Sequence, residues 1–95
     1  MTDAVVADNP QKHRFELRFD ETVAGFAAYR LEPDRVVFTH TEVDPQFEGQ
    51  GLGSKLAAGA LDAVREKGLA IVAQCPFIAA YVKRHPEYQD LVATT

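Results

Sequence analysis

The feature that most restricts this chain's fold is the passage from an apolar run, through three alternating glycines, into a helical pattern. The run Val36–Phe38 leads into THTEVDPQFEGQGLGSK, with glycines at positions 49, 51 and 53. A strand that enters a helix through such a loop leaves the first backbone N–H groups of the helix without partners, at the positive end of its dipole. Glycines let this backbone approach a ligand closely. The stretch therefore predicts an anion site, and we expect it to bind a pyrophosphate.

Two common phosphate-binding motifs do not fit this loop. The dinucleotide-binding fingerprint belongs to the first βα unit of a fold and expects an acidic residue at the end of the next strand. Here strands precede the loop, and the next strand ends at Gln74-Cys75. A Walker loop needs Gly-Lys-Ser/Thr at its end, which this loop lacks. A tight turn that binds nothing remains the alternative.

Before the loop, alternating apolar residues predict three strands joined by short turns. They cover Lys12–Phe19, Val23–Leu31 and Arg35–Val43, an antiparallel meander. The polar segment Met1–Gln11 is expected to be a flexible tail. Residues 12–95 are expected to form a single domain, because a chain of 95 residues has no room for a second.

After the loop, the periodicity changes to that of helices. A helix is predicted over Leu52–Lys67 and ends at Gly68, which suits a left-handed cap. The apolar run Leu69–Ala73 is typical of a buried strand parallel to the third. A second helix is expected over about Phe77–Arg84, with Pro76 in its first turn, and one more helical turn within Glu87–Val92. The order β-β-β-α-β-α predicts an α+β fold with a mixed sheet, in which a right-handed crossover joins the parallel strands.

Composition narrows the function classes. The net charge of −4 argues against binding to nucleic acid or an anionic membrane, because no basic surface can release counterions. The single cysteine excludes an internal disulfide and a cysteine-based metal site, and it fits a reducing compartment. No signal peptide and no apolar run of about 18 residues are visible, so we expect a cytoplasmic protein. No set of histidines and carboxylates has metal-ligand spacing, and we expect no metal.

Two residues could carry chemistry by their position. Cys75 follows the buried strand, at the edge where α/β sheets hold ligands, and the helix start behind it would favour a thiolate. Packing in the core is the competing role for this cysteine. His40 lies on the third strand near the loop, and imidazole changes charge near neutral pH, so it could serve as a general base. A structural or partly exposed histidine is the alternative.

The loop and the second helix together resemble a known family. EGQGLGSKL is similar to the acyl-CoA loop of the GNAT superfamily of N-acetyltransferases, whose pattern is Arg/Gln-Gly-x-Gly-x-Gly/Ala. Glu48 stands at the Arg/Gln position and departs from the pattern. Tyr81-Val82-Lys83 resembles the Tyr-x-Lys of the family's second CoA motif. The run CPFIAAYVKRHPEY further resembles a short, YjdJ-type, GNAT-like branch, and the resemblance covers about Phe15–Val92.

The resemblance implies a minimal GNAT-like fold and acetyl-CoA as cofactor. Its pyrophosphate would rest on the amides of Glu48–Ser54, its pantetheine arm would lie beside Thr41–Val43, and its thiol end would approach Cys75 and Tyr81. Lys55, and also Lys83 or Arg84, could offset the charge of Glu48, although ordinary surface roles suit these bases equally well. The residues implied to bind the cofactor are Val43, Glu48, Gly49, Gln50, Gly51, Leu52, Gly53, Ser54, Lys55, Tyr81 and Lys83.

The resemblance also implies an N-acetyltransferase acting on an amine, either a small molecule or a protein. Tyr81 would protonate the departing thiolate, while packing on the sheet is its alternative role. Cys75 would be a covalent relay or would only border the thioester. Two rival functions are a CoA-binding module without catalysis and an interaction protein that has lost the site. Whether a homodimer completes the acceptor pocket stays open.

Overall fold

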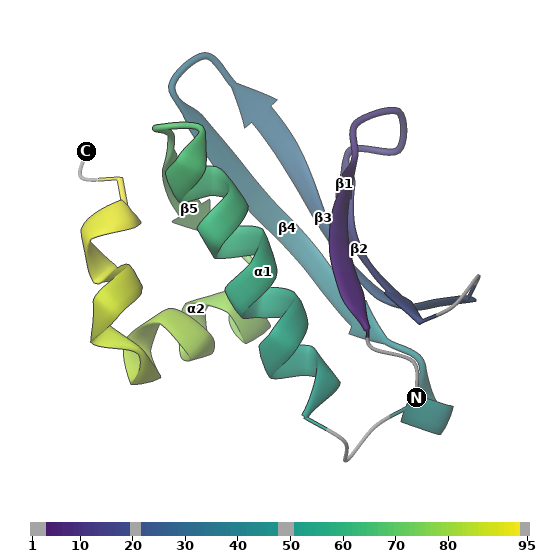
Figure 1. Cartoon of the computed structure of the whole chain (residues 1–95). Coiled ribbons are helices and arrows are strands. Elements are labelled where there is room, and N and C mark those ends of the chain that lie inside the picture. Colours follow the sequence, from purple (N-terminus) through teal and green to yellow (C-terminus); the bar gives the residue numbers. More distant parts are fainter. Residues whose placement is uncertain (1–3, 20–21, 48–50, 94–95) are drawn as a thin grey trace.

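The computed structural model of this chain describes residues 4–19, 22–47 and 51–93. It has two layers, a five-stranded sheet and a group of helices that lie on one of its faces (Figure 1). The strands are β1 (Val5–Asn9), β2 (Arg14–Phe19), β3 (Thr22–Glu32), β4 (Arg35–Val43) and β5 (Ala70–Ala73). The helices are α1 (Leu52–Glu66) and α2 (Pro76–Arg84), with 3₁₀ turns η1 (Pro45–Phe47) and η2 (Pro86–Leu91).

The strands lie in chain order across the sheet. Strands β1 to β4 pair antiparallel, and β5 pairs parallel to β4. This arrangement confirms the predicted α+β class, with an antiparallel meander and one parallel connection through α1. Each antiparallel pair from β2 to β4 contains one irregularity, between Leu17 and Arg18 in the first pair and between Ala28 and Tyr29 in the second.

The prediction of a loose tail over residues 1–11 is wrong for Val5–Asn9, which form β1. This edge strand pairs with β2, with Val6 opposite Leu17. Its second contact is with α1, where Gly59 leaves room for the Val6 side chain. Tertiary packing therefore holds a segment whose own apolar pattern is too short to predict a strand.

The helix ends agree with the sequence prediction. After α1, Gly68 has a left-handed φ of 70°, and the amide of Leu69 reaches back to the carbonyl of Val64 at 3.3 Å. Pro76 opens α2, where its missing N–H breaks no helical bond. The expected last helical turn is η2.

The core lies between the sheet and the helices. It is made by alternate residues of the strands and by one face of each helix. The largest fully buried side chains are Phe15, Phe38, Leu17, Leu56, Leu61, Ile71, Ile78, Val37 and Val64. Burying each of these side chains contributes about 1.5–3 kcal/mol of transfer free energy to folding. This burial holds the sheet and α1 together as one packed unit. Within the described ranges, no helix has the length and apolar character needed to cross a membrane.

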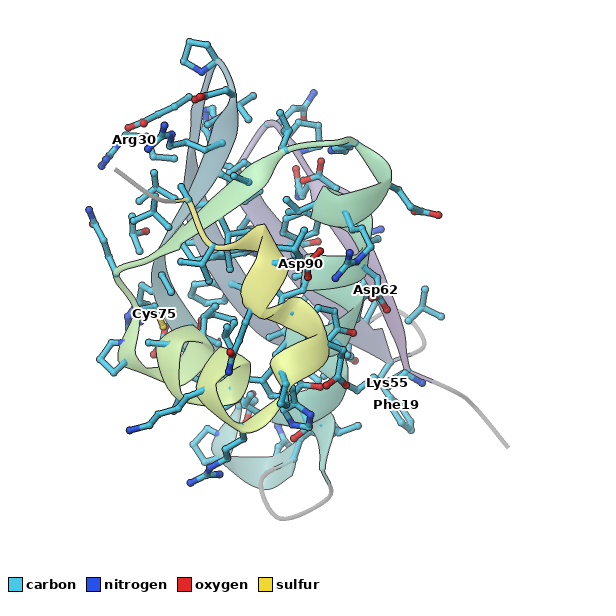
Figure 2. All side chains as sticks on the ribbon, turned by 90° about the vertical axis from the view of Figure 1, so that its left-hand side faces the viewer. Phe19, Arg30, Lys55, Asp62, Cys75 and Asp90 are labelled. Atoms are coloured by element: carbon cyan, nitrogen blue, oxygen red, sulfur yellow. The ribbon has the colours of Figure 1, made fainter. Side chains whose placement is uncertain are left out.

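Side-chain hydrogen bonds fasten η2 to α1. Arg65 makes two bonds to the carboxylate of Asp90, at 2.9 and 3.0 Å, and the hydroxyl of Tyr88 donates to Asp62 at 2.9 Å. Figure 2 shows Asp62 on α1 and Asp90 on η2. Burial, followed by the hydrogen bond and charge of Asp62, raises the pKa of Tyr88 to about 12. The end of the described chain is thereby held against the helix layer.

A buried carboxylate lies on the sheet face away from the helices. Glu16 is 3% exposed and accepts bonds from Arg14 at 2.8 Å, Arg18 at 2.7 Å and Asn9 at 3.2 Å. Its own partners cover it, since no further layer of the described chain lies on that face (Figure 1). Burial alone would raise the pKa of Glu16, but the bonds from Arg18, Arg14 and Asn9, with the charge of Arg14, lower it to about 2.

Candidate cofactor site

The first turn of α1 begins with three backbone amides that bond no residue of the described ranges. Gly51 is the N-cap, with φ 72° and ψ 12°, a left-handed conformation that favours glycine. The first bond of the helix runs from the amide of Lys55 to the carbonyl of Gly51, at 3.3 Å. The amides of Leu52, Gly53 and Ser54 have no hydrogen-bond partner among the described residues. These donors, at the positive end of the helix dipole, form an arrangement that suits an anion.

These amides open on a groove of about 280 Å³. Its lining residues are Val43, Phe47, Gly51, Leu52, Gly53, Ser54 and Phe77. A Cβ added to Gly53 would lie 2.9 Å from Cζ of Phe77, so glycine keeps the groove clear at this point. The groove is thus lined both by the residues of the helix start and by apolar and aromatic side chains.

Beside the groove, β4 extends beyond the end of β5. The two strands pair only from Arg35 to Phe38, and the carbonyl of Phe38 accepts the amides of Gln74 and Cys75, both at 3.0 Å. The chain then turns into α2, while β4 continues to Val43. In the described part of the chain, no strand pairs with that edge of residues 39–43. An extended ligand arm could therefore pair there as an additional strand would.

Cys75 lies where β4 and β5 separate. Its side chain is 3% exposed, and its thiol donates to Oγ1 of Thr41 at 3.1 Å. Figure 2 shows Cys75 at the start of α2, beside the sheet. The structure thus brings the predicted cysteine to the open edge of β4, the strand that ends at the groove-lining Val43.

Tyr81 lies in a different environment. It is half-buried on α2, its ring stacks on His85 with centroids 4.0 Å apart, and Tyr88 lies 6.0 Å away. Burial, followed by the negative charges of Glu87 and Asp62, raises the pKa of Tyr81, so its hydroxyl keeps its proton at neutral pH. These neighbours belong to η2 and α1, whereas the neighbour of Cys75 belongs to β4.

His40 lies on the other face of the sheet. It is exposed, its Nε2 is 3.4 Å from the carboxylate of Glu42, and its ring is 6.0 Å from that of Phe26. It precedes Thr41 in the chain, but consecutive strand residues point to opposite faces. The structure therefore does not bring His40 together with Tyr81.

The remaining predicted residues divide into two groups. Lys55 and Lys83 are exposed and make no ion pair within the described ranges. Glu48, Gly49 and Gln50 lie outside the described residues.

Sequence reasoning missed the side chains of Phe47 and Phe77 and the contact of Thr41 with Cys75, although it placed the pantetheine arm beside Thr41–Val43. The signal for Phe77 was an aromatic residue directly after the Pro76 that opens α2, and Phe77 is 40% exposed at the groove. Phe47 immediately precedes the glycine loop. The contact of Thr41 with Cys75 had no local signal, because it joins positions 34 residues apart.

The family model described as GCN5-related N-acetyl-transferase matches residues 14–91. The fold is similar to an NMR solution structure from Staphylococcus aureus, described as a GCN5-like candidate N-acetyltransferase, with a TM-score of 0.73 and 24% identity. That match covers 100% of this chain and 93% of the other. No match was found among curated proteins.

Proposed function

The chain belongs to the family of GCN5-related N-acetyltransferases, and on this basis we propose that it transfers an acyl group from acetyl-CoA to an amine. The observation that carries the proposal is the set of amides at Leu52–Ser54, which bond no residue that the structure describes and belong to residues lining a groove beside the edge of β4 that no described strand pairs with. Backbone donors at a helix start suit a pyrophosphate, and an unpaired strand edge suits an amide-bearing arm.

The residues around the groove fit the parts of such a cofactor. The amides of Leu52, Gly53 and Ser54 would hold the pyrophosphate, and Phe47 and Phe77 would pack against the apolar part of the pantetheine arm. Lys55 and Lys83 are exposed cations that would face the phosphates. Bound acetyl-CoA would supply the acyl group as an activated thioester. Main-chain N–H groups on the open edge of β4 would stabilise the charge that develops on its carbonyl oxygen.

Two routes for the acyl group follow from the positions of Cys75 and Tyr81. In direct transfer, the amine nitrogen would bond the acyl carbon as the C–S bond breaks; Tyr81 would give its proton to the departing thiolate, and the proton lost by the amine would restore the tyrosine. In a relay, Cys75 Sγ would bond the acyl carbon first, its thiol proton leaving with the CoA thiolate, and the amine would then displace Sγ and return a proton to it. The contact of Cys75 with Thr41 at the open edge of β4 supports the relay. The neighbours of Tyr81 lie on the η2 side, which gives the direct route less support.

Binding is tested by thermal unfolding with acetyl-CoA. Ligand at a hundredfold excess over its dissociation constant stabilises a protein by about 2.7 kcal/mol, a clear shift for a domain of this size. Ser54 offers a matched pair of variants. Ser54→Pro removes one amide donor in a helical turn that tolerates proline, and Ser54→Ala keeps the donor. We expect Ser54→Pro to weaken binding about tenfold and Ser54→Ala to leave it nearly unchanged.

The outcomes separate the proposal from its rivals. Absence of any stabilisation by millimolar acetyl-CoA would leave only an interaction protein. Binding without thioester consumption across a panel of amines would leave a CoA-binding module. A larger loss of acetyl-CoA affinity in Ser54→Ala than in Ser54→Pro would contradict the role given to the backbone amides.

The two routes are separated by intact-mass measurement after incubation with acetyl-CoA. The relay predicts a mass increase of about 42 Da on Cys75, the gain when an acetyl group replaces the thiol hydrogen, and this increase is absent in Cys75→Ser. Direct transfer predicts no adduct and a larger loss of rate in Tyr81→Phe than in Cys75→Ser. Active protein without the adduct, and with an undiminished rate in Cys75→Ser, would remove the relay.

A further inference from the structure

The hydroxyl of Thr41, on the part of β4 that extends beyond β5, contacts the thiol of Cys75. Cys75 is the N-cap of α2, yet its side chain makes no capping bond to that helix. Its thiol donates instead to Oγ1 of Thr41 at 3.1 Å. Cys75 is buried and Thr41 is half-buried, so the contact is largely shielded from water. The sulfur is therefore directed by β4 and not by its own helix.

A register shift between β3 and β4 places Thr41 on the sheet face that the helices cover. Two consecutive residues of β3 lie opposite Phe38 and His40, so Thr39 is an extra residue of β4. Strict alternation from the buried Phe38 would turn His40 toward the helices, and the extra residue turns Thr41 there instead. The bulge therefore decides which side chain of β4 reaches Cys75.

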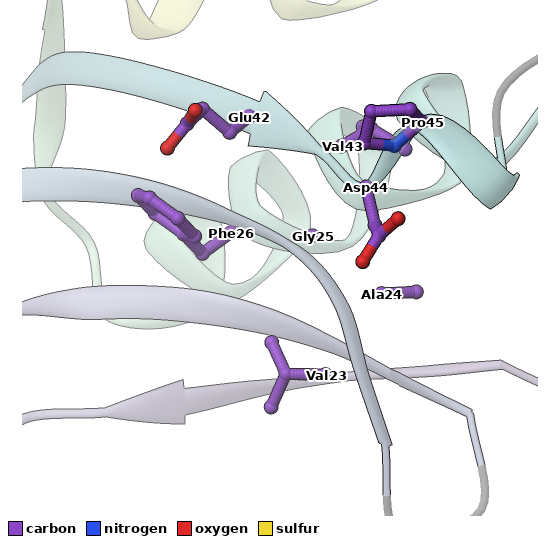
Figure 3. A pocket seen from close by; sticks show the side chains of 8 residues that line it. All are labelled: Val23, Ala24, Gly25, Phe26, Glu42, Val43, Asp44 and Pro45. Atoms are coloured by element: carbon purple, nitrogen blue, oxygen red, sulfur yellow. The ribbon is translucent and has the colours of Figure 1, made fainter.

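Beyond the shift the pairing is regular, with Ala27 opposite Thr41. Figure 3, drawn around a hollow at this end of the two strands, shows the next pair, Phe26 and Glu42. Glu42 lies 3.4 Å from His40, so these two residues share the face away from the helices. Thr41 lies between them in the chain and points to the opposite face, where Ala27 is fully buried. The neighbouring side chains thus confirm the direction of the Thr41 hydroxyl.

A hydroxyl is suited to both forms of the thiol. The neutral thiol donates its hydrogen to Oγ1, and a thiolate accepts a hydrogen from the same hydroxyl after the hydroxyl has rotated. The bond to the thiolate is charge-assisted and is therefore the stronger of the two. Threonine has few χ1 conformations because its Cβ is branched, so the hydroxyl is held in place. Among the described side chains, that of Thr41 is the one that hydrogen-bonds the sulfur.

We propose that Thr41 is a positioning residue, which holds Cys75 Sγ at the open edge of β4 and stabilises the sulfur when it has lost its proton. Its role in catalysis rests on the relay of the proposed acyl transfer. In the relay, Sγ bonds the acyl carbon as the C–S bond of acetyl-CoA breaks, and the thiol proton leaves with the CoA thiolate. The Thr41 hydroxyl donates to the sulfur while the sulfur has no proton, and it keeps its own O–H bond throughout. When the amine displaces Sγ and returns a proton to it, the hydroxyl accepts again.

The test follows alkylation of Cys75 by iodoacetamide, a small neutral reagent, in the folded protein without acetyl-CoA. Cys75 is the only cysteine of the chain, so the reaction reports on this residue alone. Thr41→Val keeps the branched shape and removes the hydroxyl, whereas Thr41→Ser keeps the hydroxyl. We expect the rate constant to fall about fivefold in Thr41→Val, because a charge-assisted bond favours the thiolate and the accompanying loss of nucleophilicity offsets less than half of that gain. Thr41→Ser should restore the wild-type rate.

Thr22→Val is the matched control. Thr22 is an exposed threonine of β3, and its replacement should leave the alkylation rate unchanged. Valine favours strands, so Thr41→Val should keep the unfolding midpoint of the wild type, measured by circular dichroism. In urea-unfolded protein, all the variants should react at the same rate.

Three results would overturn the proposal. One is an unchanged alkylation rate in folded Thr41→Val. Another is a rate in Thr41→Ser as low as that in Thr41→Val, because the hydroxyl would then not be the group that acts. The third is a wild-type thiol that reacts only after unfolding.

Acetylation of Cys75 is measured separately, by the mass increase with acetyl-CoA, so the two proposals can fail independently. Slower alkylation in Thr41→Val, without acetylation of any variant, would support the role of Thr41 at the sulfur and remove the relay. Acetylation of Cys75 at equal rates in the wild type and in Thr41→Val would support the relay and overturn the role of Thr41.

Discussion

The packing of β1 on α1 can be tested at Gly59. This glycine lies in the middle of α1, and its neighbour on the edge strand is Val6. A Cβ built on Gly59 would lie 2.6 Å from both Cβ and Cγ2 of Val6 and 3.0 Å from its Cγ1. Ordinary contacts between carbon atoms begin near 3.5 Å. Because Cβ itself is among the close atoms, no side-chain rotation of Val6 removes the clash, and the strand or the helix must move.

The expected magnitude follows from two opposing terms. Replacing glycine by alanine inside a helix stabilises by about 1 kcal/mol when nothing else changes. Adding a methyl group to a filled contact costs about 1–3 kcal/mol. With all three close contacts to a side chain anchored at Cβ, the second term is larger. We therefore expect Gly59→Ala to lower the free energy of unfolding by about 1–2 kcal/mol.

The assay is a double-mutant cycle by urea unfolding, monitored by circular dichroism. Val6→Gly removes the three atoms nearest to the new methyl group, although it weakens β1 on its own. In that background, Gly59→Ala should stabilise by about 1 kcal/mol, as it does in an open helix. The coupling energy between the two positions should then be about 2–3 kcal/mol. If Gly59→Ala stabilises the wild-type chain, β1 does not pack on α1, and the reasoning fails.

Three further results are expected. Gly53→Ala should change stability little, because the ring of Phe77 is 40% exposed and can turn away, but it should weaken acetyl-CoA binding by narrowing the groove; equal affinity by calorimetry would count against the groove as the cofactor site. Glu16 has a pKa lowered from 4.5 to about 2, so it contributes stability above pH 4.5 that is lost as the pH falls through about 2. The shift corresponds to about 3 kcal/mol as an upper value, and urea unfolding between pH 2 and 7 should show this loss in the wild type but not in Glu16→Gln. Tyr88→Phe should lower stability by about 1 kcal/mol through the lost bond to Asp62, whereas an unchanged unfolding midpoint would show that η2 is held by other contacts.

The local sequence pattern was sufficient to predict the longer helices and strands. Strands β2 to β4 alternate over six or more residues, and α1 shows an apolar face through its length, so their periods identify them. Strand β1 is different, because VVADN has no clear alternation and borders a proline turn. A signal did exist elsewhere, since a glycine inside a helical pattern usually has a packing reason. Gly59 indicated that another segment packs closely against α1, but the sequence did not identify that segment.

The candidate site was predictable only in part for a similar reason. The glycine spacing locates the start of α1, since N-cap and first-turn geometry are local. The faces of Cys75, Tyr81 and His40 depend on where β4 and β5 separate and on the register shift between β3 and β4, which tertiary pairing decides. No single position of the sequence indicates any of these pairings.

The two glycines inside α1 show that one helix contributes both to the packing of the fold and to the candidate cofactor site. Each weakens the helix by about 1 kcal/mol relative to alanine, and each faces a bulky neighbour, Val6 for Gly59 and Phe77 for Gly53. At Gly59 the space beside the helix is filled by Val6 of the edge strand β1. The packing of β1 on α1 offsets the helix stability that the glycine costs. At Gly53 the neighbour is an exposed ring, and the space opens on the groove. A helix residue that weakens its helix and gains no buried contact is best explained by a ligand that fills the space, which is why substitutions at Gly53 and Gly59 should separate binding from stability.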